Sequence, residues 1–212
     1  MPLLSAYFAE LDRAWSETAG PRIALHLIGS TALMLQTNYR RGTKDGDVLQ
    51  TAALTPAIQR DLLRLAGPAS ALRSRHRLYL EIVPGGLPFL PQQPRWHDVE
   101  FADVTLHHVQ LRALDVVDVV VSKLLRMHAN DLADIDAMIK LGRVPHASLL
   151  DRFRAAVDMF AYDARGPDLP RYIANLHRVE RDLRAEGKAG QQRKLMRRIE
   201  TADVEMLYQK LL

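Results

Sequence analysis

The chain has 212 residues, of which 48% are hydrophobic and 25% are charged, with a formal net charge of +4 and no cysteine. This length suits a mid-sized domain followed by a smaller helical one, and the lack of cysteine excludes a disulfide framework and a thiolate zinc site. No apolar run has the length of a membrane span, and the first residues lack the pattern of a secretory signal, so we expect a cytoplasmic protein with no membrane partner.

Apolar periodicity and turn residues predict strands and helices in the first half of the chain and helices alone in the second half. The expected elements, in chain order, are a helix over 3–16, a strand over 22–29, a helix capped by Ser30, a strand over 45–50, a helix over 55–65, a strand over 77–83, two short strands within 97–112, and helices from 115 onward with breaks at Gly142, Gly166-Pro167 and Gly187. This order predicts an α/β domain in residues 1–112 and a helical domain in residues 113–212.

Two aspartates, Asp45 and Asp47, flank a glycine in the expected strand over 45–50. Residues two apart on a strand point to the same face, so both carboxylates share one space, where a divalent cation such as Mg²⁺ relieves their repulsion. The alternative is a turn, because Lys-Asp-Gly-Asp is also good turn composition. The pair therefore predicts either a metal site or a surface turn.

A phosphate site and a third carboxylate would complete this arrangement. Gly29 and Ser30 close a strand and open a helix, where free backbone N–H groups can receive a phosphate. Glu81 lies in the apolar stretch LYLEIV, where a charge needs a partner or a function, and it is the preferred third ligand of a two-metal site. Asp98 and Glu100 are the alternative for that role.

These residues resemble the signature of the polymerase-beta-like nucleotidyltransferases. Gly29-Ser30 followed by RRGTKDGDVL is similar to the form found in bacterial minimal nucleotidyltransferases of the AbiEii type, which include toxins of toxin–antitoxin systems. The segment SKLLRMHANDLADIDAMI is similar to a second motif of these proteins. The resemblance covers residues 22–140 and implies a mixed sheet flanked by helices.

The resemblance implies a Mg²⁺-dependent transfer of an NMP group from an NTP to an acceptor hydroxyl. Phosphoryl transfer of this kind depends on positioning and charge neutralisation. The catalytic residues implied are Asp45, Asp47, Glu81 and Lys123, of which the three carboxylates bind metal, and the nucleotide-binding residues are Gly29, Ser30, Lys44, Lys123, Arg126 and Asp134. Asp131 or Asp134 would orient Lys123 or support the fold.

The acceptor and the catalytic competence stay open at the level of sequence. Ten Lys/Arg and only four acids lie between Arg165 and Arg198, which favours RNA such as tRNA as the acceptor, with a protein as the alternative. A toxin would also have a cognate antitoxin partner. Gly46 stands where the family has a branched apolar residue, so a nucleotide-binding protein without catalysis is a second hypothesis. An antibiotic adenylyltransferase is a third.

Overall fold

A computed structural model of the chain describes residues 2–18, 20–160 and 164–189. The elements run in the order α1 (Pro2–Ser16), β1 (Ile23–Leu27), α2 (Gly29–Gln36), β2 (Asp45–Leu49), α3 (Pro56–Ala66), α4 (Ala71–His76), β3 (Tyr79–Val83), β4 (Trp96–Val99), β5 (Val109–Leu114), α5 (Val116–Lys123), α6 (Ala129–Lys140), α7 (His146–Phe160), a 3₁₀ turn (Gly166–Asp168) and α8 (Leu169–Ala189). The predicted class, a mixed sheet flanked by helices with helices behind it, is confirmed.

The chain forms two compact units, residues 1–87 with 95–115 and residues 88–94 with 116–212. The sequence predicts two continuous domains, residues 1–112 and 113–212. The difference is the segment 88–94, which leaves the first unit between two strands and belongs to the second. Its Phe89 ring lies 4.9–5.6 Å from the rings of Phe153, Phe160 and Tyr172. Burial of this aromatic ring explains why a stretch expected to be a plain loop joins a helical core.

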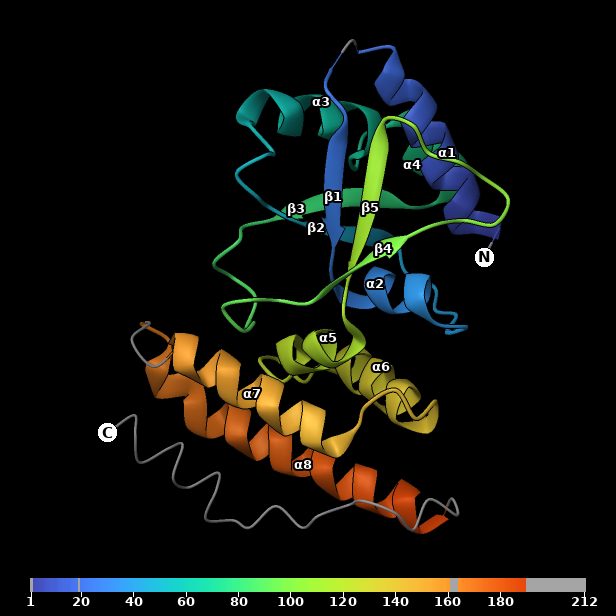
Figure 1. Ribbon diagram of the computed structural model, residues 1–212. Coiled ribbons are helices and arrows are strands. Elements are labelled where there is room, and N and C mark those ends of the chain that lie inside the picture. The colour runs from blue at the N-terminus through green and yellow to red at the C-terminus, as the bar shows by residue number, and fades with distance from the viewer. Residues whose placement is uncertain (1, 19, 161–163, 190–212) are drawn as a thin grey trace. The chain divides into compact units, whose positions relative to one another are not determined.

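The first unit is built on a five-stranded sheet with the order β3-β2-β1-β5-β4. β1 pairs with β5 and β2 with β3 in parallel, whereas β1–β2 and β4–β5 are antiparallel. On β1 the burial alternates, with Ile23, Leu25 and Leu27 inside and Ala24 and His26 only half-buried. Helices α1, α3 and α4 cover one face of the sheet, and α2 lies at the end of β1 and β5 (Figure 1).

Helix starts follow local sequence rules with one exception. The Thr55 side chain accepts a hydrogen bond from the N–H of Ile58 and caps α3, as the Thr-Pro pair predicts. Ser30, expected to cap α2, instead lies inside its first turn, because Gly29 begins the helix with a positive φ of 63°. The helix α4 was not expected from sequence; Ser70 caps it through the N–H of Arg73.

The second unit contains the helices α5 to α8. Arg152 on α7 donates to both carboxylate oxygens of the fully buried Asp118 on α5, at 2.5 and 2.7 Å, and to the carbonyl of Gln93 at 2.8 Å. These bonds tie the segment 88–94 to two helices. α8 runs through Gly187, where a break was expected, to Ala189. None of the helices in the described ranges is both long and apolar enough to span a bilayer.

Candidate active site on strand β2

Asp45 and Asp47 lie on the regular strand β2, not in a turn. The strand alternation turns both carboxylates to one face and buries Gly46 on the other. Asp45 is exposed and Asp47 is half-buried. The expectation that the pair shares one face of a strand is confirmed.

Strand β3 adds a third carboxylate beside the pair. In the parallel β2–β3 register, Glu81 is level with Asp47 and Tyr79 is level with Asp45. Residues level in a parallel pair point to the same face, so Glu81 shares the face of the two aspartates. In the described part of the chain, no three Asp, Glu, His or Cys side chains are arranged to hold a metal ion by themselves. Carboxylates that share one face of the sheet suit an ion that takes one or two of them and completes its shell with phosphate and water, as Mg²⁺ does.

The N-terminus of α2 lies against Asp47. The N–H of Ile28 donates to the Asp47 carbonyl at 2.9 Å, and no side chain caps the helix. A Cβ atom at position 29 would lie 2.6 Å from Oδ2 of Asp47, so any residue other than glycine would displace this carboxylate. The structure therefore brings the predicted phosphate site at Gly29-Ser30 and the predicted metal ligands together in the first unit.

Three further residues support the site. The Thr43 hydroxyl donates to Oδ1 of Asp45 at 2.8 Å, and the Thr31 hydroxyl donates to the Asp45 carbonyl at 3.3 Å. Arg41 Nη1 donates to the Ser30 hydroxyl at 3.1 Å, which brings a positive charge to the start of α2. Arg41 and Thr43 were not named as site residues, although their spacing before Asp45 belongs to the motif RRGTKDGD.

Tyr79 is another residue beside the carboxylates that the sequence analysis did not name. Loss of solvation raises the pKa of Tyr79, and the negative charge of Glu81 and a hydrogen bond to it raise it further. The guanidinium of Arg73 on α4 lies 5.6 Å from the centre of the Tyr79 ring. The phenol and an arginine from a neighbouring helix thus border the acidic face of β2 and β3.

Gly46 does not interrupt the strand. Its backbone is level with Leu80 on β3, and a Cβ at position 46 would lie 3.0 Å from Cδ2 of Leu80. Leu80 is fully buried and occupies the space into which a branched residue would extend. The concern that this glycine displaces the carboxylates is therefore not supported, since both aspartates keep the register of β2.

The predicted residues downstream belong to the second unit. The Lys123 ammonium lies 3.0 Å from Oδ1 of Asp131 and 2.8 Å from Oδ2 of Asp134, and all three side chains are buried. Arg126 is exposed, with Nη2 3.7 Å from Asp131. The two carboxylates compensate the charge of Lys123, so these contacts support the fold of α5 and α6. The role of Lys123 at nucleotide phosphates stays a prediction.

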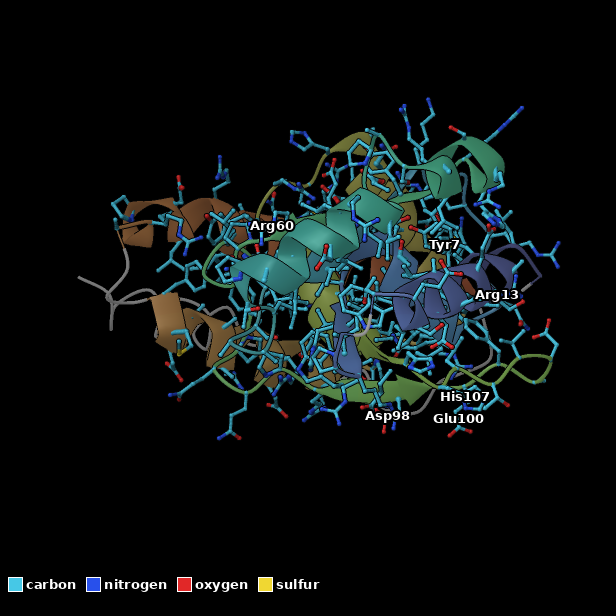
Figure 2. The ribbon with its side chains drawn as sticks, turned by 90° about the horizontal axis from the view of Figure 1, so that it is seen from above. Tyr7, Arg13, Arg60, Asp98, Glu100 and His107 are labelled. Carbon is cyan, nitrogen blue, oxygen red and sulfur yellow. The ribbon has the colours of Figure 1, made fainter. Side chains whose placement is uncertain are left out.

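The alternative acidic pair lies at the opposite edge of the sheet. Two strands separate β4 from β2, and Asp98 accepts hydrogen bonds from Gln110 and Arg112 at 3.2 and 3.1 Å. Asp98 and Glu100 are labelled in Figure 2. β4 ends at Val99, so Glu100 does not continue the strand as expected. This pair cannot share an ion with Asp45 and Asp47.

The basic run over 188–198 lies outside the residues whose side chains the structure describes.

His26, expected to be a hydrogen-bonded core residue, is half-buried, and its Nδ1 atom is buried without a hydrogen-bond partner. Its ring meets Trp96 edge to face, with centroids 4.6 Å apart. Burial lowers the pKa of His26, and the nearby Arg112 guanidinium lowers it further. The reason for the difference is its position on the half-buried face of β1, where its ring packs against Trp96.

The comparison with known families agrees with this geometry. No curated protein and no solved structure matches the chain. One family model, described as a nucleotidyltransferase of unknown function (DUF6036), matches residues 6–164 and so covers both the β2 site and the Lys123 helix pair. The chain belongs to this family of nucleotidyltransferases.

Proposed function

We propose that the protein transfers an NMP group from an NTP to an acceptor hydroxyl, with Mg²⁺ as the cofactor. The observation that carries this proposal is the contact between Asp47 and the start of α2: a carboxylate suited to a metal ion adjoins backbone N–H groups suited to a phosphate. Asp45 and Glu81 on the same face add the charge that such an ion requires. The family membership supports the same reaction class.

Each residue has a part in the proposed reaction. Gly29 and Ser30 bind the triphosphate through the start of α2, and Arg41 orients Ser30 and adds positive charge. Asp45 and Asp47 would hold the metal, and Thr43 fixes the Asp45 carboxylate by a hydrogen bond. Bound Mg²⁺ would neutralise the charge that develops on the phosphates.

The proposed reaction involves the following bond changes. The acceptor oxygen forms a bond to the α-phosphorus, the bond from that phosphorus to the β-phosphate oxygen breaks, and pyrophosphate leaves. Glu81, level with Asp47, takes the proton of the acceptor hydroxyl. Lys44, which immediately precedes β2, completes the set that we assign to nucleotide binding in the first unit.

We place the protein among the AbiEii-type enzymes, with RNA such as tRNA as the acceptor, a role as the toxin of a toxin–antitoxin pair and a cytoplasmic location. The resemblance of RRGTKDGDVL and SKLLRMHANDLADIDAMI to the motifs of those proteins supports this narrower proposal. A labelled-product survey separates it from an antibiotic adenylyltransferase, because the label then appears in RNA and not in an aminoglycoside.

A second candidate is a nucleotide-binding protein of the same fold without catalysis. It is favoured by one observation: no three acidic or histidine side chains in the described residues are arranged to hold an ion. The two candidates differ in a single assay. The protein is incubated with each α-³²P-labelled NTP, Mg²⁺ and total cellular RNA or protein, and NTP binding is measured in parallel by calorimetry.

The proposed reaction predicts a labelled acceptor with wild-type protein and none with the Asp45→Asn, Asp47→Asn double variant, whose fold is checked by circular dichroism. Binding of NTP without any labelled product would select the second candidate. Labelling that persists in the double variant would exclude both aspartates from the mechanism.

A further inference from the structure

Three basic side chains surround the start of β2 and β3. Lys44 immediately precedes β2, and its carbonyl accepts a hydrogen bond from the N–H of Tyr79 at 3.0 Å. Arg77 ends α4 in a left-handed conformation, with φ of 56°, two residues before Tyr79. Arg73 lies over the Tyr79 ring. All three side chains are exposed, and we call them the basic rim.

The basic rim adjoins the candidate active site through Tyr79. This residue is level with Asp45 in the β2–β3 register and interacts with Glu81 on its own strand. A positive surface and an acidic, metal-suited face therefore meet at the same strand ends. This juxtaposition fits a substrate that carries phosphates next to the hydroxyl that reacts, as every nucleotide of a nucleic acid does.

The side chains of the rim are available for an external anion. Arg73 is positioned by a hydrogen bond from Nη1 to the Pro68 carbonyl at 2.8 Å, which leaves the rest of its guanidinium at the surface. Within the described ranges, the charged groups of Lys44 and Arg77 form no hydrogen bond or ion pair with protein groups. Unpaired, exposed cations next to a fixed arginine form the pattern that neutralises backbone phosphates.

The surroundings favour a nucleic acid over a protein partner. A protein interface needs an apolar core surrounded by a polar rim. The large apolar side chains that are exposed in the described residues are Leu3, Leu63, Leu87, Leu141 and Met159, and none of them belongs to α4, to the loop before β2 or to β3. Charge alone, without apolar contact area, suits a polyanion.

We propose that the basic rim binds the backbone phosphates of a nucleic-acid acceptor and so brings its ribose hydroxyl to Asp45 and Asp47. This inference rests on the proposed nucleotidyl transfer, because the acceptor is the acceptor of that reaction. The rim lies entirely within the described residues of the first unit and does not depend on the basic run over 188–198.

The test compares two charge-reversal double variants in the full chain. Arg73→Glu, Arg77→Glu changes the rim at the two members that have no assigned part in NTP binding. Arg22→Glu, Arg60→Glu makes the same change in net charge at two exposed arginines elsewhere in the first unit; Figure 2 shows Arg60 on α3. Fluorescein-labelled tRNA and a DNA strand of equal length are titrated with each protein between 50 and 200 mM salt. Binding of NTP is measured separately as a check that the site is intact.

We expect the rim variant to lose affinity for tRNA by about tenfold or more, and the magnitude of its salt slope to fall by about 1.4–1.8 for two lost contacts. The control variant should change by less than about threefold. A loss of affinity in the rim variant for tRNA but not for DNA would identify RNA as the acceptor class. An equal loss of affinity for tRNA and for DNA would identify nucleic acid in general.

Equal effects of the two double variants, or wild-type affinity in the rim variant, would overturn the proposal. So would labelling of a protein acceptor by a wild-type enzyme that does not bind nucleic acid. The outcome is separable from that of the proposed function. Binding of tRNA that depends on the rim but yields no transfer would support the rim proposal and refute the proposed reaction. Transfer to RNA by the rim variant at the wild-type rate would support the reaction and refute the rim proposal.

Discussion

The carboxylate of Asp47 occupies the space that a side chain at position 29 would need, since a Cβ on Gly29 would lie 2.6 Å from its Oδ2. Gly29 also has a φ of 63°, a conformation that favours glycine. One residue therefore combines two requirements, the backbone turn that starts α2 and the close approach of a candidate metal ligand.

Replacing Gly29 by alanine should damage binding more than folding. We expect Gly29→Ala to cost about 1–3 kcal/mol through its left-handed backbone, measured by urea unfolding, and to weaken Mg²⁺-dependent NTP binding by about tenfold or more, measured by calorimetry, because the Asp47 carboxylate must move. Gly142→Ala is the matched control, since Gly142 has a φ of 65° and nothing within 4 Å of its Cβ. Equal NTP affinity in both variants would contradict the assigned role of Gly29.

The role of Gly46 can be tested by adding a Cβ atom at this position with Gly46→Ala. The nearest atom to a Cβ at position 46 is the tip of the flexible Leu80 side chain, at 3.0 Å, so Gly46→Ala should change the free energy of unfolding by less than about 1 kcal/mol. Activity should be retained, because the carboxylates on either side stay in register. Gly42→Ala, which meets nothing within 4 Å, controls for the loss of glycine itself. A large gain in transfer rate with Gly46→Ala would support the hypothesis that Gly46 impairs catalysis.

Sequence periodicity sufficed for features that depend on neighbouring residues. The shared face of Asp45 and Asp47 follows from the two-residue period of a strand, and the apolar setting of Glu81 marked it as unusual. The chain contacts that complete the site were not predictable in this way. The approach of Asp47 to Gly29 and the placing of Arg73 over Tyr79 depend on how separate elements pack.

Long-range contacts of Asp12 illustrate the same limit. On sequence alone it is a polar residue of an amphipathic helix, yet it is buried and accepts hydrogen bonds from three backbone N–H groups about 95 residues away. The segment 88–94 is similar, because its prolines predict a loop but only the tertiary structure explains the burial of Phe89. Such contacts cannot be read from local pattern.

Asp12 should be among the most important residues for the stability of the first unit. Its carboxylate accepts from the N–H groups of His107, His108 and Val109 at 3.1, 2.7 and 2.7 Å. Asp12→Ala leaves these donors without a partner, and we expect a loss of about 2–4 kcal/mol in chemical denaturation. Asp12→Asn should lose less, because it keeps one acceptor oxygen. Exposed Glu17→Ala should have no effect, and a similar loss there would contradict this account.

Lys123 offers a test between a structural and a catalytic role. Its ammonium is buried between Asp131 and Asp134, so Lys123→Gln leaves two buried carboxylates without their cation, and we expect a loss of about 3–5 kcal/mol. Exposed Arg126→Gln is the control and should lose less than about 1 kcal/mol. Lys123→Gln protein with unchanged stability but no transfer activity would instead support the predicted contact with nucleotide phosphates.

His26 predicts a specific dependence of stability on pH. Burial and then Arg112 lower its pKa from the usual 6.5, so the folded state keeps the imidazole neutral where the unfolded chain binds a proton. The contribution of His26 to stability is therefore present above about pH 6.5 and is lost as the pH falls below it, toward the lowered folded pKa. Urea unfolding at pH 7.5 and 5.5 measures this loss. We expect His26→Gln to lose less free energy of unfolding over that interval than the wild type, while exposed His107→Gln follows the wild type. Identical pH dependence in the wild type and His26→Gln would show that a group other than His26 causes the loss of stability at low pH.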